Sequence, residues 1–114
     1  MLALSSTSRI FLCRHATDMR KSYDGLSYLV ESRFGENPLC GDFFVFLNAR
    51  RDRMKILFWD NGGYCLFCKR LEKGRFRFPQ GEQPRIDRAS LSMILEGIDE
   101  KKVRRLPRYS PRDC

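Results

Sequence analysis

The sequence predicts a small α+β domain, an antiparallel β-meander with one amphipathic helix after its first strand and a second short helix after its last strand. Two observations support this prediction. Residues 42–79 contain short apolar runs separated by turn sequences, and the segments on either side carry apolar residues at helical spacing. The chain of 114 residues, 42% of them hydrophobic, is long enough for one domain with one core.

The first strand is expected at residues 8–14, SRIFLCR, and the sequence after it has the period of a helix. Thr17 or Asp18 is suited to cap the helix N-terminus, because a side-chain oxygen accepts a hydrogen bond from a free backbone N–H group. The apolar positions then fall three or four residues apart and define one stripe: Met19, Tyr23, Leu26, Val30 and Phe34. Gly35 is a suitable stop for this helix.

Three to four strands are expected next, with the sequences DFFVFLN, RMKILFWD, YCLFCKRL and RFRFP. The turn sequences ARRD, NGG and EKG lie between them. Asn61-Gly62 is the strongest turn signal, because both central residues of a type I′ hairpin turn need positive φ. A two-residue turn at this position places Trp59 opposite Tyr64.

A second helix is expected after the strands, with Asp87 or Ser90 as its N-cap. Its apolar positions would cover the sheet: Leu91, Ile94, Leu95 and Ile98. We therefore assign residues 1–100 to the α+β domain and residues 101–114 to a basic, flexible C-terminal tail. This tail has little periodicity and carries six Lys or Arg residues against one acid.

The chain is strongly basic, with 22 Lys and Arg residues against 14 Asp and Glu residues and a formal net charge of +8. Such a balance favours nucleic acid or another polyanion as the partner. No stretch approaches the ~20 consecutive apolar residues that a membrane-spanning helix needs, so no membrane role is expected. The five cysteines are an odd number and the N-terminal sequence does not resemble a secretory leader, which predicts a cytoplasmic protein with reduced thiols.

Cys65 and Cys68 have the CxxC spacing that occurs in zinc sites and redox centres. The predicted strand pairing argues against both, because it places Cys65 opposite Phe58 and Cys68 opposite Lys55. Residues three apart in a strand point to opposite faces, so the two thiols would not hold one ion. We expect no metal and no cofactor, with two structural cysteines as the default interpretation.

The same pairing divides the hairpin side chains between two faces. One face is apolar and forms the core: Met54, Ile56, Phe58, Cys65, Phe67 and Leu71, with Phe76 and Phe78 from the last expected strand. The other face mixes basic and aromatic side chains, and in this register Arg70 lies opposite Arg77. Like charges directly opposite each other are unfavourable unless an anion such as nucleic acid screens them. Alternatively, this face is solvated or covered by a helix, with Leu57, Leu66 and Trp59 in a second core layer.

No catalytic constellation is evident from the sequence. His15 is the single histidine and has no nucleophile at a suitable spacing, the acids are dispersed, and the glycines lack a phosphate-binding spacing. We expect a protein that is not an enzyme and has no small-molecule substrate.

Three motifs resemble one known family. TDMRKSYDGL at 17–26, RDRMKILFWDNGGYCLFCKRLEKGRFRFP at 51–79 and LSMILEGID at 91–99 are similar to sequences of the TnpB-type accessory proteins of the insertion sequence 66 family of bacterial transposable elements. These proteins are the second open reading frame products, and they differ from the RNA-guided nucleases that share the name TnpB. The resemblance implies a non-catalytic role in DNA transposition beside a separate transposase.

The candidate contact residues for DNA or the transposase are basic and aromatic positions of these motifs and of the second sheet face: Arg20, Lys21, Arg53, Lys55, Trp59, Tyr64, Lys69, Arg70, Arg75 and Arg77. Their cationic groups suit phosphates, and their aromatic rings suit stacking on bases. The leading hypothesis is an accessory protein that binds DNA, the transposase or both. Two alternatives stay open: a protein-only adaptor whose arginines meet acidic patches of the transposase, and a small metal-dependent nuclease.

Overall fold

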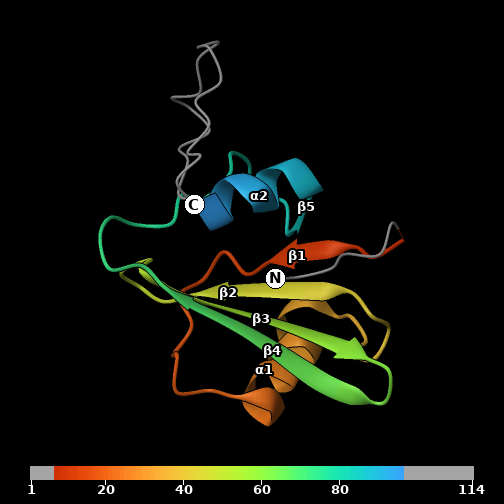
Figure 1. The fold of residues 1–114 in the computed structure, drawn as a ribbon. Helices are drawn as coiled ribbons and strands as arrows, with labels where there is room; N and C mark the ends of the chain where they lie inside the picture. Colours follow the sequence, from red (N-terminus) through yellow and green to blue (C-terminus); the bar gives the residue numbers. More distant parts are fainter. Residues whose placement is uncertain (1–6, 97–114) are drawn as a thin grey trace.

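The structure is a computed structural model and describes residues 7–96 of the chain. Its elements follow in the order β1 (Ile10–Leu12), α1 (Tyr23–Leu29), η1 (Val30–Phe34), β2 (Phe43–Leu47), β3 (Arg53–Asp60), β4 (Gly63–Arg70), β5 (Arg85–Ile86) and α2 (Arg88–Glu96). The five strands form one mixed sheet in the order β4-β3-β2-β1-β5 (Figure 1). The predicted α+β class is confirmed, whereas the predicted tail at residues 101–114 lies outside the described residues.

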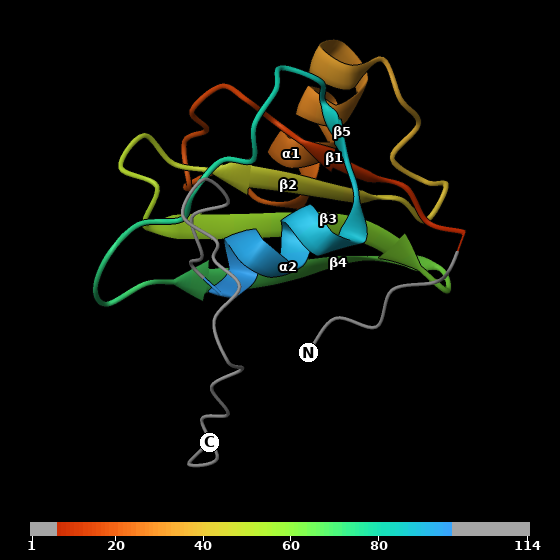
Figure 2. The same ribbon diagram turned by 90° about the horizontal axis from the view of Figure 1, so that it is seen from above.

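Helices cover both faces of the sheet, with α2 in front of it and α1 behind it in Figure 2. Successive side chains of a strand point to opposite faces, so β2 serves two cores at once. Phe43, Val45 and Leu47 enter one buried cluster, whereas Phe44 and Phe46 enter the other. All residues of β2 are buried, as expected for the central strand of a three-layer arrangement.

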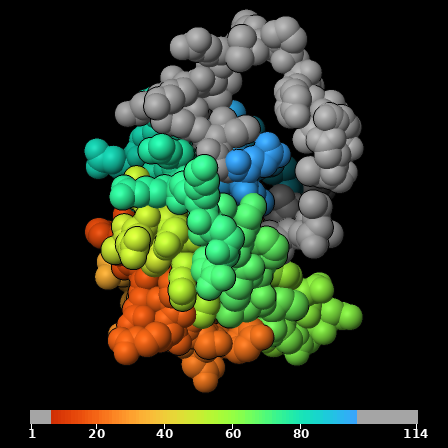
Figure 3. Space-filling view, turned by 60° about the vertical axis from the view of Figure 1, so that its left-hand side comes forward, coloured from red at the N-terminus to blue at the C-terminus, as the bar shows by residue number. Residues whose placement is uncertain are grey.

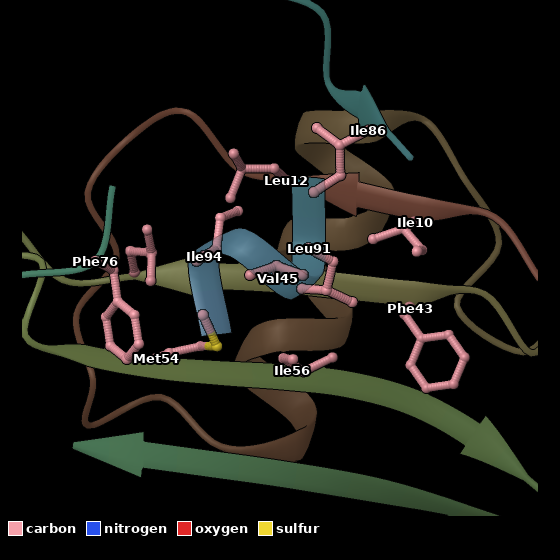
Figure 4. Close-up of a cluster of buried hydrophobic side chains, with 11 residues drawn as sticks. Ile10, Leu12, Phe43, Val45, Met54, Ile56, Phe76, Ile86, Leu91 and Ile94 are labelled. Carbon is pink, nitrogen blue, oxygen red and sulfur yellow. The ribbon is translucent and has the colours of Figure 1, made fainter. Parts of the chain in front are cut away.

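Helix α2 packs on one face of the sheet and closes the first core cluster. Leu91 and Ile94, each 1% exposed, point from α2 toward the sheet (Figure 4). They belong to one cluster with side chains of the strands: Ile10, Leu12, Phe43, Val45, Leu47, Met54, Ile56 and Ile86. Asp87 caps this helix as predicted, because its Oδ1 accepts a hydrogen bond of 2.7 Å from the Ser90 N–H. The fourth predicted helix position, Ile98, lies outside the described residues.

Helix α1 and the π-helical turn η1 cover the other face and bury a second core cluster. Leu26 of α1 and Val30 of η1 are fully buried. Their cluster includes side chains from three strands and the residue after β1: Phe11, Cys13, Phe44, Phe46 and Leu57. The middle of this face is therefore a second core layer, and the prediction of an open basic and aromatic face is wrong there. The apolar stripe of the helix needs a partner, and Leu57 and Leu66 provide it.

The first helix begins later than predicted, at Tyr23. Asp18 does not cap it, because the Asp18 carboxylate instead binds Arg20 through the backbone N–H at 2.9 Å and the guanidinium at 2.7 Å. Thr17 is buried, and its N–H donates to the Leu47 carbonyl at 2.9 Å, which holds this residue beside the end of β2. The two predicted cap residues thus fix the loop before the helix rather than the helix itself.

The end of the helical segment agrees with the prediction. Gly35 adopts a left-handed conformation with φ +63°, which ends η1. Tyr23 is 45% exposed, so the buried part of the predicted stripe is carried by Leu26, Val30 and the partly buried Phe34. None of the helices in the described part of the chain is long and apolar enough to cross a membrane.

Strands β1 and β2 are parallel, with Ile10 opposite Phe43 and Leu12 opposite Val45. Parallel neighbours need a crossover connection, and α1 with η1 provides it. The expected meander is correct for β2, β3 and β4, which pair in antiparallel order. The sheet as a whole is mixed, however, because β1 adds beside β2 in parallel orientation, whereas every other pair in the sheet is antiparallel.

Residues 75–79, RFRFP, do not form the predicted strand. This segment is a loop that lies against the β2–β3 turn, where the Phe76 N–H donates to the Arg51 carbonyl at 2.6 Å. The Phe76 side chain is fully buried in the first core cluster, so it anchors the loop without strand pairing. The last strand is instead the short β5, which pairs with β1 in antiparallel orientation.

The β3–β4 hairpin has the predicted register. Trp59 lies opposite Tyr64, and the turn residues Asn61 and Gly62 have φ values of 47° and 91°, as a type I′ turn requires. A short turn and side-chain alternation therefore determine the pairing of both strands.

This register separates the two cysteines of the CxxC sequence. Cys65 lies opposite Phe58 and Cys68 lies opposite Lys55, so the thiols point to opposite faces. Both are free thiols. Within residues 7–96, no group of three His, Cys, Asp or Glu side chains is arranged to hold a metal ion.

Candidate nucleic-acid interface

The chain segments that follow β1, β2 and β4 lie together at one end of the sheet. The parallel strands β1 and β2 finish at the same end, and β4 finishes there too because both β2 and β4 run antiparallel to β3. This end lies at the left of Figure 1 and comes forward in Figure 3. Figure 3 shows the segments around residues 13–22, 48–53 and 70–80 side by side there.

Hydrogen bonds join these segments into one surface. The Lys55 ammonium donates to the Lys21 carbonyl at 2.7 Å, which connects β3 to the segment before α1. The Leu71 N–H donates to the Asp52 carbonyl at 2.8 Å, which connects the end of β4 to the β2–β3 turn. The side chains on these segments are therefore held in a fixed relative arrangement.

Cations dominate this surface, which we call the basic end. We define it by the Lys and Arg residues of the joined segments: Arg14, Arg20, Lys21, Arg50, Arg51, Arg53, Lys55, Arg70, Lys73, Arg75 and Arg77. The same segments contain three carboxylates, Asp18, Asp52 and Glu72. Such an excess of one sign creates a positive potential over the surface.

The structure brings together seven of the ten predicted contact residues. The basic end contains all the predicted cations except one: Arg20, Lys21, Arg53, Lys55, Arg70, Arg75 and Arg77. Sequence reasoning missed Arg14, Arg50, Arg51 and Lys73. For Arg50 and Arg51 a signal existed, because two consecutive arginines occupy a turn between two buried strands, where they must face solvent.

The other three predicted residues lie elsewhere. Trp59 and Tyr64 flank the hairpin turn at the opposite end of β3 and β4, with their rings edge to face and the centroids 5.0 Å apart. Lys69 points to the α2 face, where its ammonium donates to the Leu95 carbonyl in the last turn of α2. A cation at a helix C-terminus is favourable, so Lys69 has a structural partner. Aromatic and basic side chains of the hairpin thus do not share one open surface.

Arg70 lies opposite Arg53, and the predicted pairing of Arg70 with Arg77 is wrong because Arg77 belongs to a loop. Hydrogen-bonded and non-hydrogen-bonded pairs alternate along an antiparallel hairpin, and the pair beside the turn, Asp60 and Gly63, is hydrogen-bonded. Arg53 and Arg70 are therefore a non-hydrogen-bonded pair, in which the Cα atoms are ~4.5 Å apart. Arg70 Nε donates to Glu72 at 2.9 Å, but both side chains are exposed. The repulsion between the two arginines is therefore only partly offset.

Two carboxylates of the basic end, Asp18 and Asp52, have pKa values below the ordinary value of an aspartate. The side-chain and backbone hydrogen bonds from Arg20 lower the pKa of Asp18 to about 2. The pKa of Asp52 is also lowered, first by the hydrogen bond from the Asn48 side chain and then by the nearby Arg50 charge. The Arg20 side chain remains 92% exposed beside Asp18, so one side of its guanidinium faces solvent.

Stacked arginines hold the loop of residues 75–79 in place. Arg51 has a positive φ of 59°, and its guanidinium lies 4.1 Å from the centroid of the Phe78 ring. The Arg14 guanidinium lies 6.0 Å from the same centroid and donates to the carbonyl of the next residue at 2.8 Å. These interactions fix the loop that carries Arg75 and Arg77 beside the β2–β3 turn.

The fold and its basic end define a small α+β domain with a surface suited to polyanions. The chain belongs to the family of IS66 Orf2 like proteins, whose family model matches residues 8–105. This match confirms the resemblance found in the sequence motifs, and it extends into the first residues of the predicted tail. Membership implies a transposition-associated accessory protein, in a family without a known catalytic role.

Two similar proteins come from Sinorhizobium fredii (strain NBRC 101917 / NGR234). The uncharacterized protein y4jC is 34% identical over 113 residues, which cover 97% of each chain. The uncharacterized protein y4hO is 38% identical over 101 residues, which cover 87% of this chain and 88% of the relative. No solved structure matches the chain.

Proposed function

We propose that the protein is a non-catalytic accessory protein of IS66 transposition that binds DNA through its basic end. The observation that carries this proposal is the assembly of cations from three separate chain segments at one end of the sheet. Four exposed arginines of this end form no side-chain hydrogen bond or ion pair with other described residues: Arg50, Arg53, Arg75 and Arg77. Their guanidinium groups are available for charge-assisted hydrogen bonds to phosphates.

The proposed interactions are with the phosphate backbone. The aromatic pair Trp59 and Tyr64 lies at the opposite end of the hairpin, so it is not placed to stack on bases of a nucleic acid that occupies the basic end. Arg51 already covers the Phe78 ring. Hydrogen bonds from arginines to phosphates carry no direct sequence information, so we expect affinity with little sequence preference.

The transposase of the same element is the proposed protein partner. The basic end is a candidate site for the transposase as well as for DNA, because its arginines also suit acidic protein patches. If the basic end binds only the transposase, the protein is an adaptor that does not touch DNA directly. The two functions are distinguished by one measurement: the purified protein binds DNA if it is a DNA-binding accessory protein, and it does not if it is a protein-only adaptor.

Fluorescence anisotropy with a labelled duplex, repeated over a series of salt concentrations, tests the proposal. We expect affinity to fall steeply with salt. The double variant Arg50→Gln and Arg77→Gln should reduce the slope of log affinity against log salt by about 0.9 for each phosphate that it no longer neutralises. The matched control is Arg33→Gln with Arg85→Gln, which removes the same charge from exposed positions in η1 and β5.

The control variant should keep the slope of the unmodified protein. Equal effects of the two double variants would show that total charge matters and the basic end does not. Absence of salt-dependent DNA binding, together with co-purification with the transposase, would establish the protein-only adaptor instead.

A further inference from the structure

Strand β4 is an edge of the sheet, and no strand within residues 7–96 pairs with its outer side. Along this strand, residues whose backbone is hydrogen-bonded to β3 alternate with residues whose backbone groups point outward, starting from a hydrogen-bonded residue beside the turn. The residues that exchange hydrogen bonds with β3 are Gly63, Cys65, Phe67 and Lys69. The backbone N–H and C=O groups of the residues between them therefore point outward: Tyr64, Leu66, Cys68 and Arg70.

Apart from the charged Lys69 and Arg70 at its C-terminal end, this edge lacks the features that commonly prevent pairing with another strand. The β3–β4 pairing is continuous over the length of β4 without a bulge, and the strand contains no proline. Its central residues 64–68, YCLFC, carry no charge. An edge of this length and composition is a template for another strand.

Both hydrophobic cores also remain incomplete at β4. Phe67 packs against the first core cluster but is only partly buried. Leu66 and Tyr64 pack against the second cluster and are partly buried as well. A strand added beside β4 would extend the backbone hydrogen bonds and cover apolar side chains on both faces.

We propose that β4 pairs in antiparallel orientation with β4 of a second copy of this chain, which joins two sheets into one across a twofold axis. The same strand supplies both sides of such an isologous interface, so its outward N–H and C=O groups meet identical groups in the required order. The uncharged residues 64–68 lie at the centre of this pairing.

The charge distribution favours a second copy in this orientation. The basic end lies at the C-terminal end of β4, whereas the hairpin turn with Asp60 lies at its N-terminal end. Antiparallel pairing places the basic end of each copy beside the turn of the other. The cations of the two copies then lie apart by about the length of the strand, about 26 Å.

This dimer has a consequence that rests on the proposed function. The two basic ends face in opposite directions along the strand axis of the shared sheet. Each end would bind its own duplex, so one dimer would hold two DNA segments together. A monomer with the same basic end would bind one segment only.

Light scattering and sedimentation of the full chain, under reducing conditions and without DNA, test the dimer. We expect twice the mass of the 13.5 kDa chain. Cys68→Pro removes an outward N–H from an exposed position and leaves the hydrogen bonds to β3 in place, so this variant should be monomeric. Cys68→Ser keeps the N–H and should remain dimeric, which also excludes a disulfide as the cause.

Amide hydrogen exchange gives a second measurement that does not depend on the proline variant. In the dimer, the amides of Tyr64, Leu66 and Cys68 should exchange as slowly as those of Cys65 and Phe67. Fast exchange of the three outward amides in a monomeric protein would overturn the proposal. Protection of these amides only after the transposase is added would assign the edge to a different partner, which also overturns it.

The bridging step has its own test with two differently labelled duplexes. The dimer should capture the second duplex through the first, whereas Cys68→Pro should bind a single duplex and fail to capture another. A dimer that binds no DNA at all would contradict the proposed function and leave the β4 interface intact. Capture of the second duplex by Cys68→Pro would contradict the role of the interface.

Discussion

The cross-strand pair of Arg53 and Arg70 gives the sharpest test of the basic end. The perturbation is the double substitution Arg53→Gln and Arg70→Gln, which retains polar side chains at both positions but removes both charges. Arg70 is 62% exposed and Arg53 is exposed, so neither side chain is needed to fill a core. The substitution should therefore affect binding more than folding.

The expected change in stability is small because two effects oppose each other. Like charges opposite each other destabilise a sheet, and the substitution relieves this repulsion; favourable cross-strand pairs contribute roughly 0.2–1 kcal/mol, which sets the scale of the effect. The substitution also removes the exposed ion pair between Arg70 and Glu72, and such pairs contribute about 0–1 kcal/mol. The free energy of unfolding should stay within about 1 kcal/mol of that of the unmodified protein.

The expected change in DNA binding is larger. Removal of each charge-assisted hydrogen bond to a phosphate should weaken binding by about 1–3 kcal/mol at low salt. The slope of log affinity against log salt should become shallower by roughly 0.9 for each phosphate that is no longer neutralised. Urea denaturation and duplex anisotropy on the same preparation measure the two effects.

The reasoning fails if the double variant unfolds while any folded fraction binds DNA as strongly as before. The two arginines would then be structural partners of other residues. The control variant carries Arg33→Gln and Arg85→Gln. If it loses as much DNA affinity as Arg53→Gln with Arg70→Gln, the reasoning also fails, because a general charge effect would then explain the result.

Three further predictions concern residues whose roles differ. The folded pKa of Asp18, about 2, lies below its ordinary value of 3.8, so its contribution to stability is present above about pH 4 and is lost as pH falls toward 2. A carbon-13 NMR titration should show this pKa, and Arg20→Gln should raise it toward 3.8. Phe76→Ala should lower the free energy of unfolding by about 3–5 kcal/mol, as measured in urea, because a fully buried ring is removed; a change near zero would mean that the loop is not anchored there. Cys65→Ser and Cys68→Ser together should leave DNA binding intact, and elemental analysis of the unmodified protein should find no stoichiometric zinc; about one zinc per chain, absent from the double variant, would refute this.

Much of the central hairpin could be predicted from sequence because its determinants are local. The Asn61-Gly62 turn allows the positive φ values of a type I′ turn, and side-chain alternation then fixes which residues share a face. Gly35 at the helix end and Asp87 at the α2 N-cap act in the same way, through the backbone within one turn of the chain. These features depend only on neighbouring residues.

Two errors have a common physical cause, since each arose where another group competed for the same atoms. Asp18 had a nearby guanidinium available and bound it instead of the helix N-terminus. The RFRFP segment has the alternation of a strand, but burial of Phe76 and its hydrogen bond to Arg51 hold it as a loop. In this segment, the alternating pattern correctly predicted that Phe76 faces the core, but it predicted a strand where the structure has a loop.

The amino-acid sequence alone shows that the protein is basic, which hairpin residues face the core, and which family the motifs resemble. The parallel pairing of β1 with β2 is visible only in the three-dimensional fold, and this pairing creates the basic end. Because the two parallel strands finish at one end, the residues after each of them meet there, and Arg14 and Arg51 become neighbours of the loop after β4. Strand pairing across the crossover is a long-range choice, governed by burial of both sheet faces, and it leaves no local signal in the chain.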